Sequence, residues 1–196
     1  CVLERGREFL PGEFPDTQLE LVRETQTLTP AGHVGSRTAL VDVRLDRDMN
    51  VLIGCGLGGT SLINANVALE AEPAVFEDPA WPPEIRDDLP NRVADGLARA
   101  REMLAPTPYP DDAPKLLKLQ RLEESARTMG APFYRPPINV TFKERLSSGG
   151  VRQPACTNCG DCVTGCNVGS KNTTQMNYLP DAKRHGAEIF TLAEVR

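Results

Sequence analysis

The order of apolar and polar residues predicts a chain built from short strands and a few helices. Residues 38–45 alternate between apolar and charged side chains, which indicates a half-buried strand. Residues 50–53 form a short apolar run that ends at a cluster of glycines. The apolar residues at positions 19–22 and 138–142 predict two further short strands, and the polar segment 25–37 is expected to form turns.

Three segments carry helical periodicity. Residues 91–105 place apolar side chains on one face, with Asn91 as the expected N-cap. Residues 113–129 predict a second helix that ends at Gly130, and residues 174–185 predict a third. The apolar stripe of the second helix is formed by Leu116, Leu119, Leu122, Ala126 and Met129.

Both ends of the chain resemble interrupted strands. Residues 2–4 are apolar up to an acid and then a glycine, which is typical of the end of a strand, and residues 187–196 form a strand-like run with no turn after it. These ends predict that the 196 residues belong to a longer protein. The proline-rich segment 73–90 is expected to be irregular.

Charge and hydrophobicity exclude two classes of function. The chain has 22 basic and 27 acidic residues, a net charge of -5, so it lacks the overall positive charge that nucleic acids or anionic membranes attract. It contains no apolar run of about 18 residues, the length needed to cross a bilayer. We therefore expect no nucleic-acid partner and no transmembrane segment.

A glycine cluster at residues 54–59 fits the pattern G-x-G-x-x-G and follows a predicted strand. Glycines in this position let the backbone approach a pyrophosphate. A simple dinucleotide-binding unit would continue through a helix to a second strand, but here the proline-rich segment follows. From the pattern alone, a glycine turn required only for packing remains an alternative.

Residues 54–68 as a whole resemble the flavin-approach segment of the glucose–methanol–choline (GMC) oxidoreductase family, with its cholesterol oxidase branch nearest. Cys55 departs from the family pattern, which usually has a basic or amide residue there. The resemblance implies FAD as cofactor and an α/β fold: a partial, Rossmann-like FAD-binding domain with an inserted, mostly helical region and a Cys-rich loop. It implies cofactor contacts by Gly56, Gly58, Gly59, Thr60, Ser61, Asn64, Ala65 and Val67.

Two further segments resemble the same family. Residues 2–6 resemble its second strand, which implies that Glu4 binds the adenosine ribose. Residues 171–195 resemble the return to the nucleotide domain, where the backbone of Val195 would meet the adenine. The implied division is into residues 1–72 (FAD-binding), 73–150 (helical and proline-rich), 151–170 (Cys-rich loop) and 171–196 (return helix and strand).

The resemblance implies an enzyme that oxidises the CH–OH group of an alcohol, hydrophobic or sterol-like, by hydride transfer to flavin while a base takes the hydroxyl proton. Its electron acceptor would be oxygen or a redox partner. The family's phosphate loop and catalytic histidine match nothing here, so we assign no catalytic residue and expect the chain alone to be inactive. His33 and His185 are expected at the surface.

Four cysteines lie within eleven residues. Cys156, Cys159, Cys162 and Cys166 have the C-x2-C-x2-C-x3-C spacing of a bacterial ferredoxin run, although Asn167 replaces the usual proline. A 4Fe–4S cluster would take its fourth ligand from Cys166 or from a remote thiol, Cys55 or Cys1. A structural zinc ion, disulfides and free thiols are the alternatives.

The cysteine motif also supplies two alternative functions from other classes. One is a ferredoxin-like electron-transfer module in which the glycine loop is only structural, and the other is a zinc-stabilised interaction domain. A bound iron–sulfur cluster would favour the cytoplasm; otherwise the sequence assigns no compartment.

Overall fold

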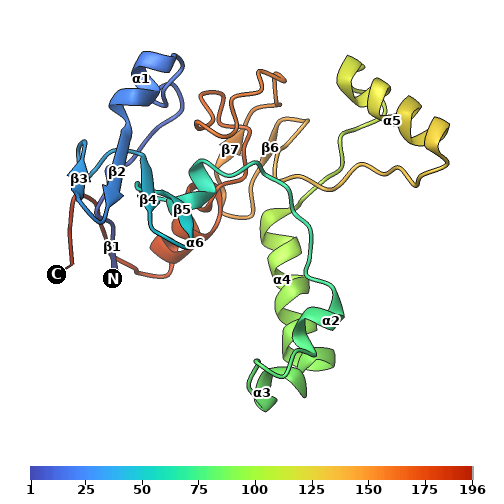
Figure 1. Ribbon diagram of the computed structural model, residues 1–196, viewed down its shortest axis with the longest axis horizontal. Helices are drawn as coiled ribbons and strands as arrows, with labels where there is room; N and C mark the ends of the chain where they lie inside the picture. Colours follow the sequence, from blue (N-terminus) through green and yellow to red (C-terminus); the bar gives the residue numbers. More distant parts are fainter. Residues whose placement is uncertain (196) are drawn as a thin grey trace.

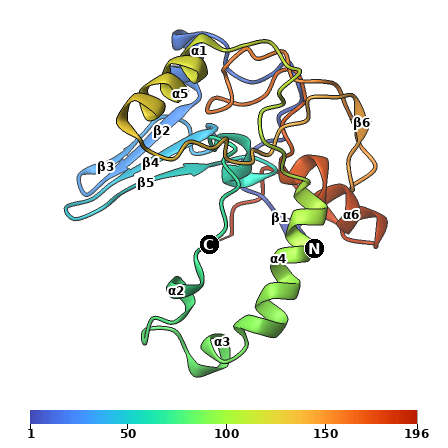
Figure 2. The ribbon, with the colours of Figure 1, turned by 90° about the vertical axis from the view of Figure 1, so that its right-hand side faces the viewer.

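The computed structural model describes residues 1–195, and of Leu89 and Pro90 the backbone alone. Short sheets and loops form one body, from which a helical arm projects (Figure 1; Figure 2). Helix α5 (Leu117–Met129) stands apart from both the sheets and this arm (Figure 1). No helix in this described part of the chain is long and apolar enough to cross a membrane.

The main sheet has four strands in the order β3-β2-β4-β5. Strand β2 (Thr25–Thr29) pairs antiparallel with β3 (Gly32–Val34) and parallel with β4 (Val41–Leu45), and β4 pairs antiparallel with β5 (Asn50–Gly54). The structure confirms the strands predicted within residues 38–45 and 50–53. The fold is mixed α/β, as expected.

The prediction of turns throughout residues 25–37 is wrong, because β2 and β3 form a hairpin there. The inward-facing residue of β2 is Gln26, which is 1% exposed and donates from Nε2 to the carbonyls of Arg37 and Ala39. Its Oε1 lies 3.1 Å from Nε2 of His33, which is half-buried rather than at the surface. A polar side chain at the buried position hides the alternation that marks a strand.

The strand predicted at residues 19–22 is a helix, α1 (Gln18–Arg23). Thr17 and Glu20 form a capping box, in which each side chain accepts from the backbone N–H of the other residue. Leu19 and Val22 are 61% and 70% exposed, and of the apolar run Leu21 packs against the hydrophobic core. The cap therefore decides the local structure.

The two chain ends pair with each other. Strand β1 (Val2–Leu3) lies parallel to β8 (Ile189–Phe190), and the amide of Glu4 donates to the carbonyl of Phe190 at 2.9 Å. The strand character predicted at both ends is thus confirmed, and each is the partner of the other. A third sheet joins β6 (Arg145–Leu146) and β7 (Arg152–Gln153).

The remaining elements are helices, all of them short except α4, with 11 residues, and α5, with 13. They are η1 (Gly59–Leu62), α2 (Pro73–Phe76), α3 (Pro83–Arg86), η2 (Leu89–Val93), α4 (Ala94–Leu104), α5 (Leu117–Met129), η3 (Thr174–Met176) and α6 (Tyr178–Arg184). Asn91 is not the N-cap of α4, because the π-helical turn η2 runs directly into it. Helix α5 ends at Gly130 with φ 64°, as predicted, but its stripe is only partly covered, with Leu122 61% and Met129 79% exposed.

Residues 138–142 form isolated β-bridges rather than the predicted strand. Ile138 bridges to Val67 and Thr107, and Val140 bridges to Lys171. The segment therefore crosses from one loop to another, and no single neighbour is long enough to extend a ladder. The hydrophobic core lies between the main sheet and the glycine loop and consists of Phe9, Phe14, Leu40, Val41, Leu62 and Ile63.

Asp42 of β4 joins the main sheet to the segment that leaves β1. Its carboxylate is 3% exposed and lies 2.8 Å from Arg5 and 3.2 Å from Arg44. Burial alone would raise the pKa of this carboxyl, but the hydrogen bonds from Arg44 and Arg5 outweigh burial and lower the pKa.

Replacing Asp42 with asparagine is expected to lower the free energy of unfolding by about 2 kcal/mol at pH 7, because it removes the charge that pairs both arginines. The lowered pKa means that the stabilisation is complete above the unfolded-state pKa of about 3.9 and is lost as the pH falls through the folded-state value. Denaturant titrations of the unmodified protein and of Asp42→Asn from pH 7 to pH 2 measure this, because their free energies of unfolding should converge at low pH. The exposed Asp48→Asn is the control, and equal losses for both variants would contradict the pairing.

Candidate functional site

The glycine loop packs directly against the backbone that leaves β1. A Cβ atom added to Gly6 would lie 2.5 Å from the Gly56 nitrogen, and one added to Gly54 would lie 2.4 Å from the Gly59 oxygen. The Leu57 amide also donates to the Arg7 carbonyl at 3.0 Å. Gly54 and Gly6 are therefore required for close backbone contact.

The second half of the glycine loop opens outward. Gly58 and Gly59 have φ of 118° and 56°, a left-handed conformation that glycine adopts readily. No atom lies within 4 Å of the position where a Gly59 Cβ would point, and the neighbouring Thr60 is exposed. The backbone at Gly59 therefore faces open space, whereas a Cβ atom on Gly58 would lie 2.9 Å from the Leu62 side chain.

The residues predicted to contact the cofactor separate into an inner and an outer set. Gly56 is buried, and Ser61 donates to the Gly58 carbonyl at 2.6 Å and accepts from the Thr174 amide at 3.1 Å, so both serve packing in this structure. The exposed set comprises Thr60, Asn64, Ala65 and Val67. The side chain of Cys55, the departure from the family pattern, is buried against the Arg37 carbonyl.

Glu4 and the C-terminal segment lie beside the same loop. The Glu4 carboxylate accepts from the Gly6 amide at 2.6 Å, and the Ala193 amide donates to the Glu4 carbonyl at 2.9 Å. The Leu192 amide donates to the Gly6 carbonyl at 3.0 Å. Gly6 thus connects three sequence motifs: the Glu4 strand, the glycine loop and the segment that leads to the exposed Val195.

Lys171 is a site residue to which the sequence reasoning gave no role. It is 2% exposed, and its Nζ donates to the carbonyls of Leu62 at 2.9 Å, Asn64 at 2.8 Å and Cys162 at 2.8 Å. Burial lowers the pKa of Lys171 to about 8, and the neighbouring Cys162 and Cys166 oppose this shift. The ammonium joins the segment after the glycine loop to the cysteine loop.

The cysteine loop has no regular secondary structure, but it is tied at several points. The Cys156 amide donates to the Thr141 carbonyl at 2.9 Å. Asn167 accepts from the amides of Gly12 and Phe14, at 3.0 and 2.9 Å, and donates to the Phe14 carbonyl. A proline in place of Asn167, as in the ferredoxin pattern, would lose all three hydrogen bonds made by this side chain.

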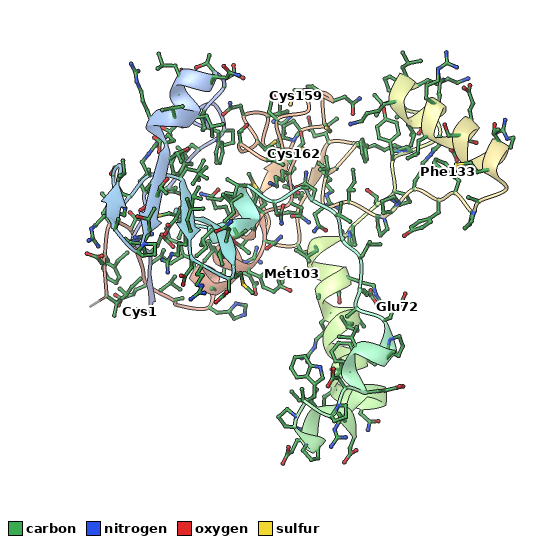
Figure 3. The ribbon with its side chains drawn as sticks, in the orientation of Figure 1. Cys1, Glu72, Met103, Phe133, Cys159 and Cys162 are labelled. Atoms are coloured by element: carbon green, nitrogen blue, oxygen red, sulfur yellow. The ribbon has the colours of Figure 1, made fainter. Side chains whose placement is uncertain are left out.

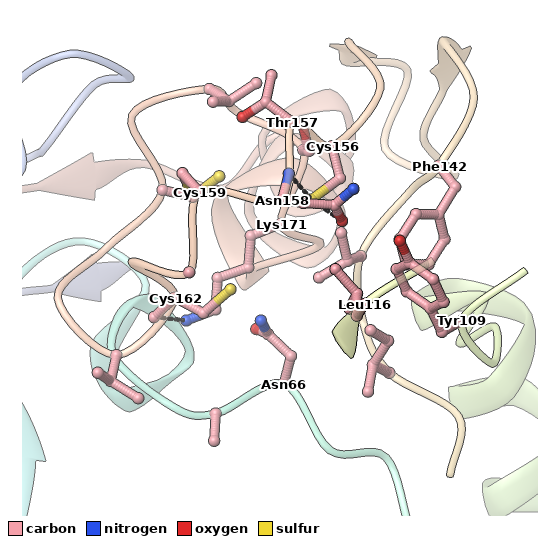
Figure 4. A pocket seen from close by; sticks show the side chains of 18 of the residues that line it. Asn66, Tyr109, Leu116, Phe142, Cys156, Thr157, Asn158, Cys159, Cys162 and Lys171 are labelled. Atoms are coloured by element: carbon pink, nitrogen blue, oxygen red, sulfur yellow. Dashed lines mark hydrogen bonds between the residues drawn. The ribbon is translucent and has the colours of Figure 1, made fainter. Parts of the chain in front are cut away.

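All four loop cysteines line one cavity of about 440 Å³. Cys156, Cys159 and Cys162 face it from one side, with Leu116 and Phe142 across from them (Figure 4). All six cysteines are free thiols. Burial raises the pKa of the Cys156 and Cys162 thiols. Among the side chains of the described residues, no three of His, Cys, Asp or Glu are grouped so that they could hold a metal ion.

Comparison with known proteins agrees with these motifs. Residues 28–196 match the family model described as GMC oxidoreductase. A cholesterol oxidase of Mycobacterium tuberculosis (strain H37Rv) is 28% identical over 212 residues, which covers 100% of this chain and 35% of that protein. A cholesterol oxidase of Acinetobacter baumannii is 26% identical over 166 residues, which covers 79% of this chain and 29% of that protein.

The chain therefore spans about a third of the length of these curated relatives. The comparisons give no support to a separate ferredoxin-like module or to a zinc-stabilised domain. The family model covers the glycine loop, the cysteine loop and the C-terminal segment in one match. The chain belongs to the GMC oxidoreductases, and its cofactor is FAD.

Proposed function

We propose that this chain forms the flavin- and adenosine-contacting part of an FAD-dependent enzyme that oxidises the CH–OH group of a hydrophobic or sterol-like alcohol. One observation carries the proposal most strongly. The contacts of Gly6 bring the Glu4 strand, the glycine loop and the C-terminal segment to one surface. Three motifs that are far apart in the sequence therefore lie together around one buried glycine.

Each of the three motifs would hold a different part of the cofactor. The open backbone at Gly59 and the exposed Thr60 would lie against the flavin ring, because no side chain stands between them and solvent. The Glu4 carboxylate would accept hydrogen bonds from the ribose hydroxyls, and the backbone of Val195 would meet the adenine. FAD, when bound, supplies the hydride acceptor.

The substrate class rests on the relatives, which are named cholesterol oxidases. Anaerobic mixing of a full-length, FAD-loaded enzyme that contains these residues with alcohols tests it, because reduction bleaches the flavin absorbance. We expect a 3-hydroxysteroid to bleach the flavin and choline or glucose to leave it oxidised. Bleaching by the small polar alcohols alone would contradict the proposed substrate class but leave the FAD assignment intact.

Glu4→Gln is expected to weaken FAD binding about tenfold, which corresponds to about 1.4 kcal/mol. The glutamine Oε1 still accepts from the Gly6 amide, so the local turn is kept. The variant loses the charge and exchanges the second acceptor oxygen for a donor. Fluorescence titration with FAD measures the change.

The matched control is Glu8→Gln, which makes the same exchange at an exposed glutamate four residues further along the chain. We expect its FAD affinity to equal that of the unmodified protein. Equal weakening in both variants would indicate a general charge effect and would contradict a specific role for Glu4.

A further inference from the structure

We propose that the loop from Cys156 to Cys166 binds one 4Fe–4S cluster, with all four of its cysteines as ligands. The proposal does not depend on the alcohol oxidation proposed above. It rests on the position of the four cysteines around one cavity, on the size of that cavity and on the contacts that hold the loop.

The cavity favours a polyatomic group over a single ion. A zinc ion holds its thiolates about 2.3 Å away, so four ligands around it leave no empty space between them. Here the four cysteines lie, together with other side chains, along the lining of a cavity of about 440 Å³. A cubane of iron and sulfide fills the centre of such an arrangement and is reached by thiolates that stand further apart.

The structure also selects the fourth ligand. Cys166 lines the same cavity as Cys156, Cys159 and Cys162. Of the two remote thiols, the Cys55 sulfur is buried 3.6 Å from the Arg37 carbonyl. Cys1 lies at the far end of β1, well away from the labelled Cys159 and Cys162 (Figure 3). A single cluster can therefore be closed by the loop itself.

The loop is held in shape before any ligand binds. Asn158, Gly160 and Gly165 all have positive φ, which turns the loop back on itself. A Cβ atom on Gly165 would lie 2.0 Å from the Phe14 ring, so the loop is seated closely on that ring. Asn167 and the Lys171 ammonium fix the end and the middle of the loop through the backbone hydrogen bonds described above.

The surroundings suit an anionic cluster. The Asn158 amide donates to the Cys156 sulfur at 3.4 Å, the kind of hydrogen bond that tunes iron–sulfur sites. The Lys171 ammonium lies beside Cys162, where its positive charge offsets the negative charge of the thiolates (Figure 4). Tyr109, Leu116 and Phe142 line the cavity across from the cysteines (Figure 4).

The test is elemental analysis of the full chain, purified without oxygen and reconstituted with ferric iron, sulfide and an excess of dithiothreitol, which supplies the two electrons per cluster. We expect about four iron and four sulfide per chain, and an electron paramagnetic resonance signal after reduction with dithionite. Zinc without sulfide, or no retained metal after reconstitution, would overturn the proposal. Flavin content is measured on the same samples, so a failure here is distinct from a failure of the FAD assignment.

Cys159→Ser is the test variant, because Cys159 is exposed and serine has nearly the same size. We expect it to lose most of the iron and sulfide, while Cys1→Ser, at an exposed cysteine outside the loop, retains both. Circular dichroism checks that both variants fold. Alkylation adds a readout in the unmodified chain: the loop thiols should react slowly with the cluster in place and rapidly after its removal by a chelator, and equal rates would count against the cluster.

Discussion

Gly54→Ala is expected to lower the free energy of unfolding by about 3 kcal/mol, at the upper end of the usual cost of overpacking. The added Cβ would lie 2.4 Å from the Gly59 oxygen and 2.8 Å from the Thr60 Cα, and both are backbone atoms that no side-chain rotation can move away. The glycine loop would have to shift away from β5. Thermal and chemical denaturation of the variant measure the loss.

Gly96→Ala is the matched control for this prediction. Gly96 lies within α4, and no atom lies within 4 Å of its missing Cβ. Alanine there should raise stability by about 0.5–1 kcal/mol, because it has the higher helix propensity. A Gly54→Ala variant as stable as the unmodified protein would show that the loop does not pack as closely as described.

Lys171→Met is expected to cost about 3 kcal/mol and to loosen two segments together. The ammonium donates to carbonyls at Leu62, Asn64 and Cys162, and methionine leaves all three without this donor. Each buried acceptor left unpaired costs about 1–3 kcal/mol, and the desolvation of the ammonium in the native protein offsets part of the sum. Hydrogen exchange should accelerate at residues 62–66 and 156–171.

Lys118→Met makes the same replacement in the lining of the same cavity. Lys118 is exposed, so we expect a change within about 0.5 kcal/mol and unaltered exchange. If Lys171→Met accelerated exchange evenly over the whole chain, the loss would be one of general stability. That pattern would contradict the role of Lys171 in holding residues 62–66 and the cysteine loop together.

Elements can be predicted from the sequence where the hydrophobic pattern is clear or where one residue type marks a boundary. The strands β4 and β5 follow from alternation and an apolar run, and Gly130 marks the end of α5. Prediction fails where a polar side chain takes a buried position, as Gln26 does in β2, or where a cap overrides an apolar run, as Thr17 does at α1. In both places a hydrogen bond decides what hydrophobicity predicts wrongly.

In the candidate site, too, some features can be predicted from the sequence and others cannot. The motifs of the candidate flavin surface are readable because glycine spacing and an acid at a strand end leave a sequence signal. The role of Lys171 is not readable from the sequence in this way, because its three acceptors are backbone carbonyls of residues about 10 to 110 positions away, which any residue type provides. Its only sequence signal is a charged residue within the otherwise uncharged run 167–174.

The most direct test of the central claim compares hydrogen exchange of the chain with and without FAD. We expect slower exchange in three separate segments, residues 4–6, 57–66 and 192–195, with helix α5 unchanged. Protection confined to one of these segments, or absent from the glycine loop, would contradict the claim that the three motifs form one cofactor surface.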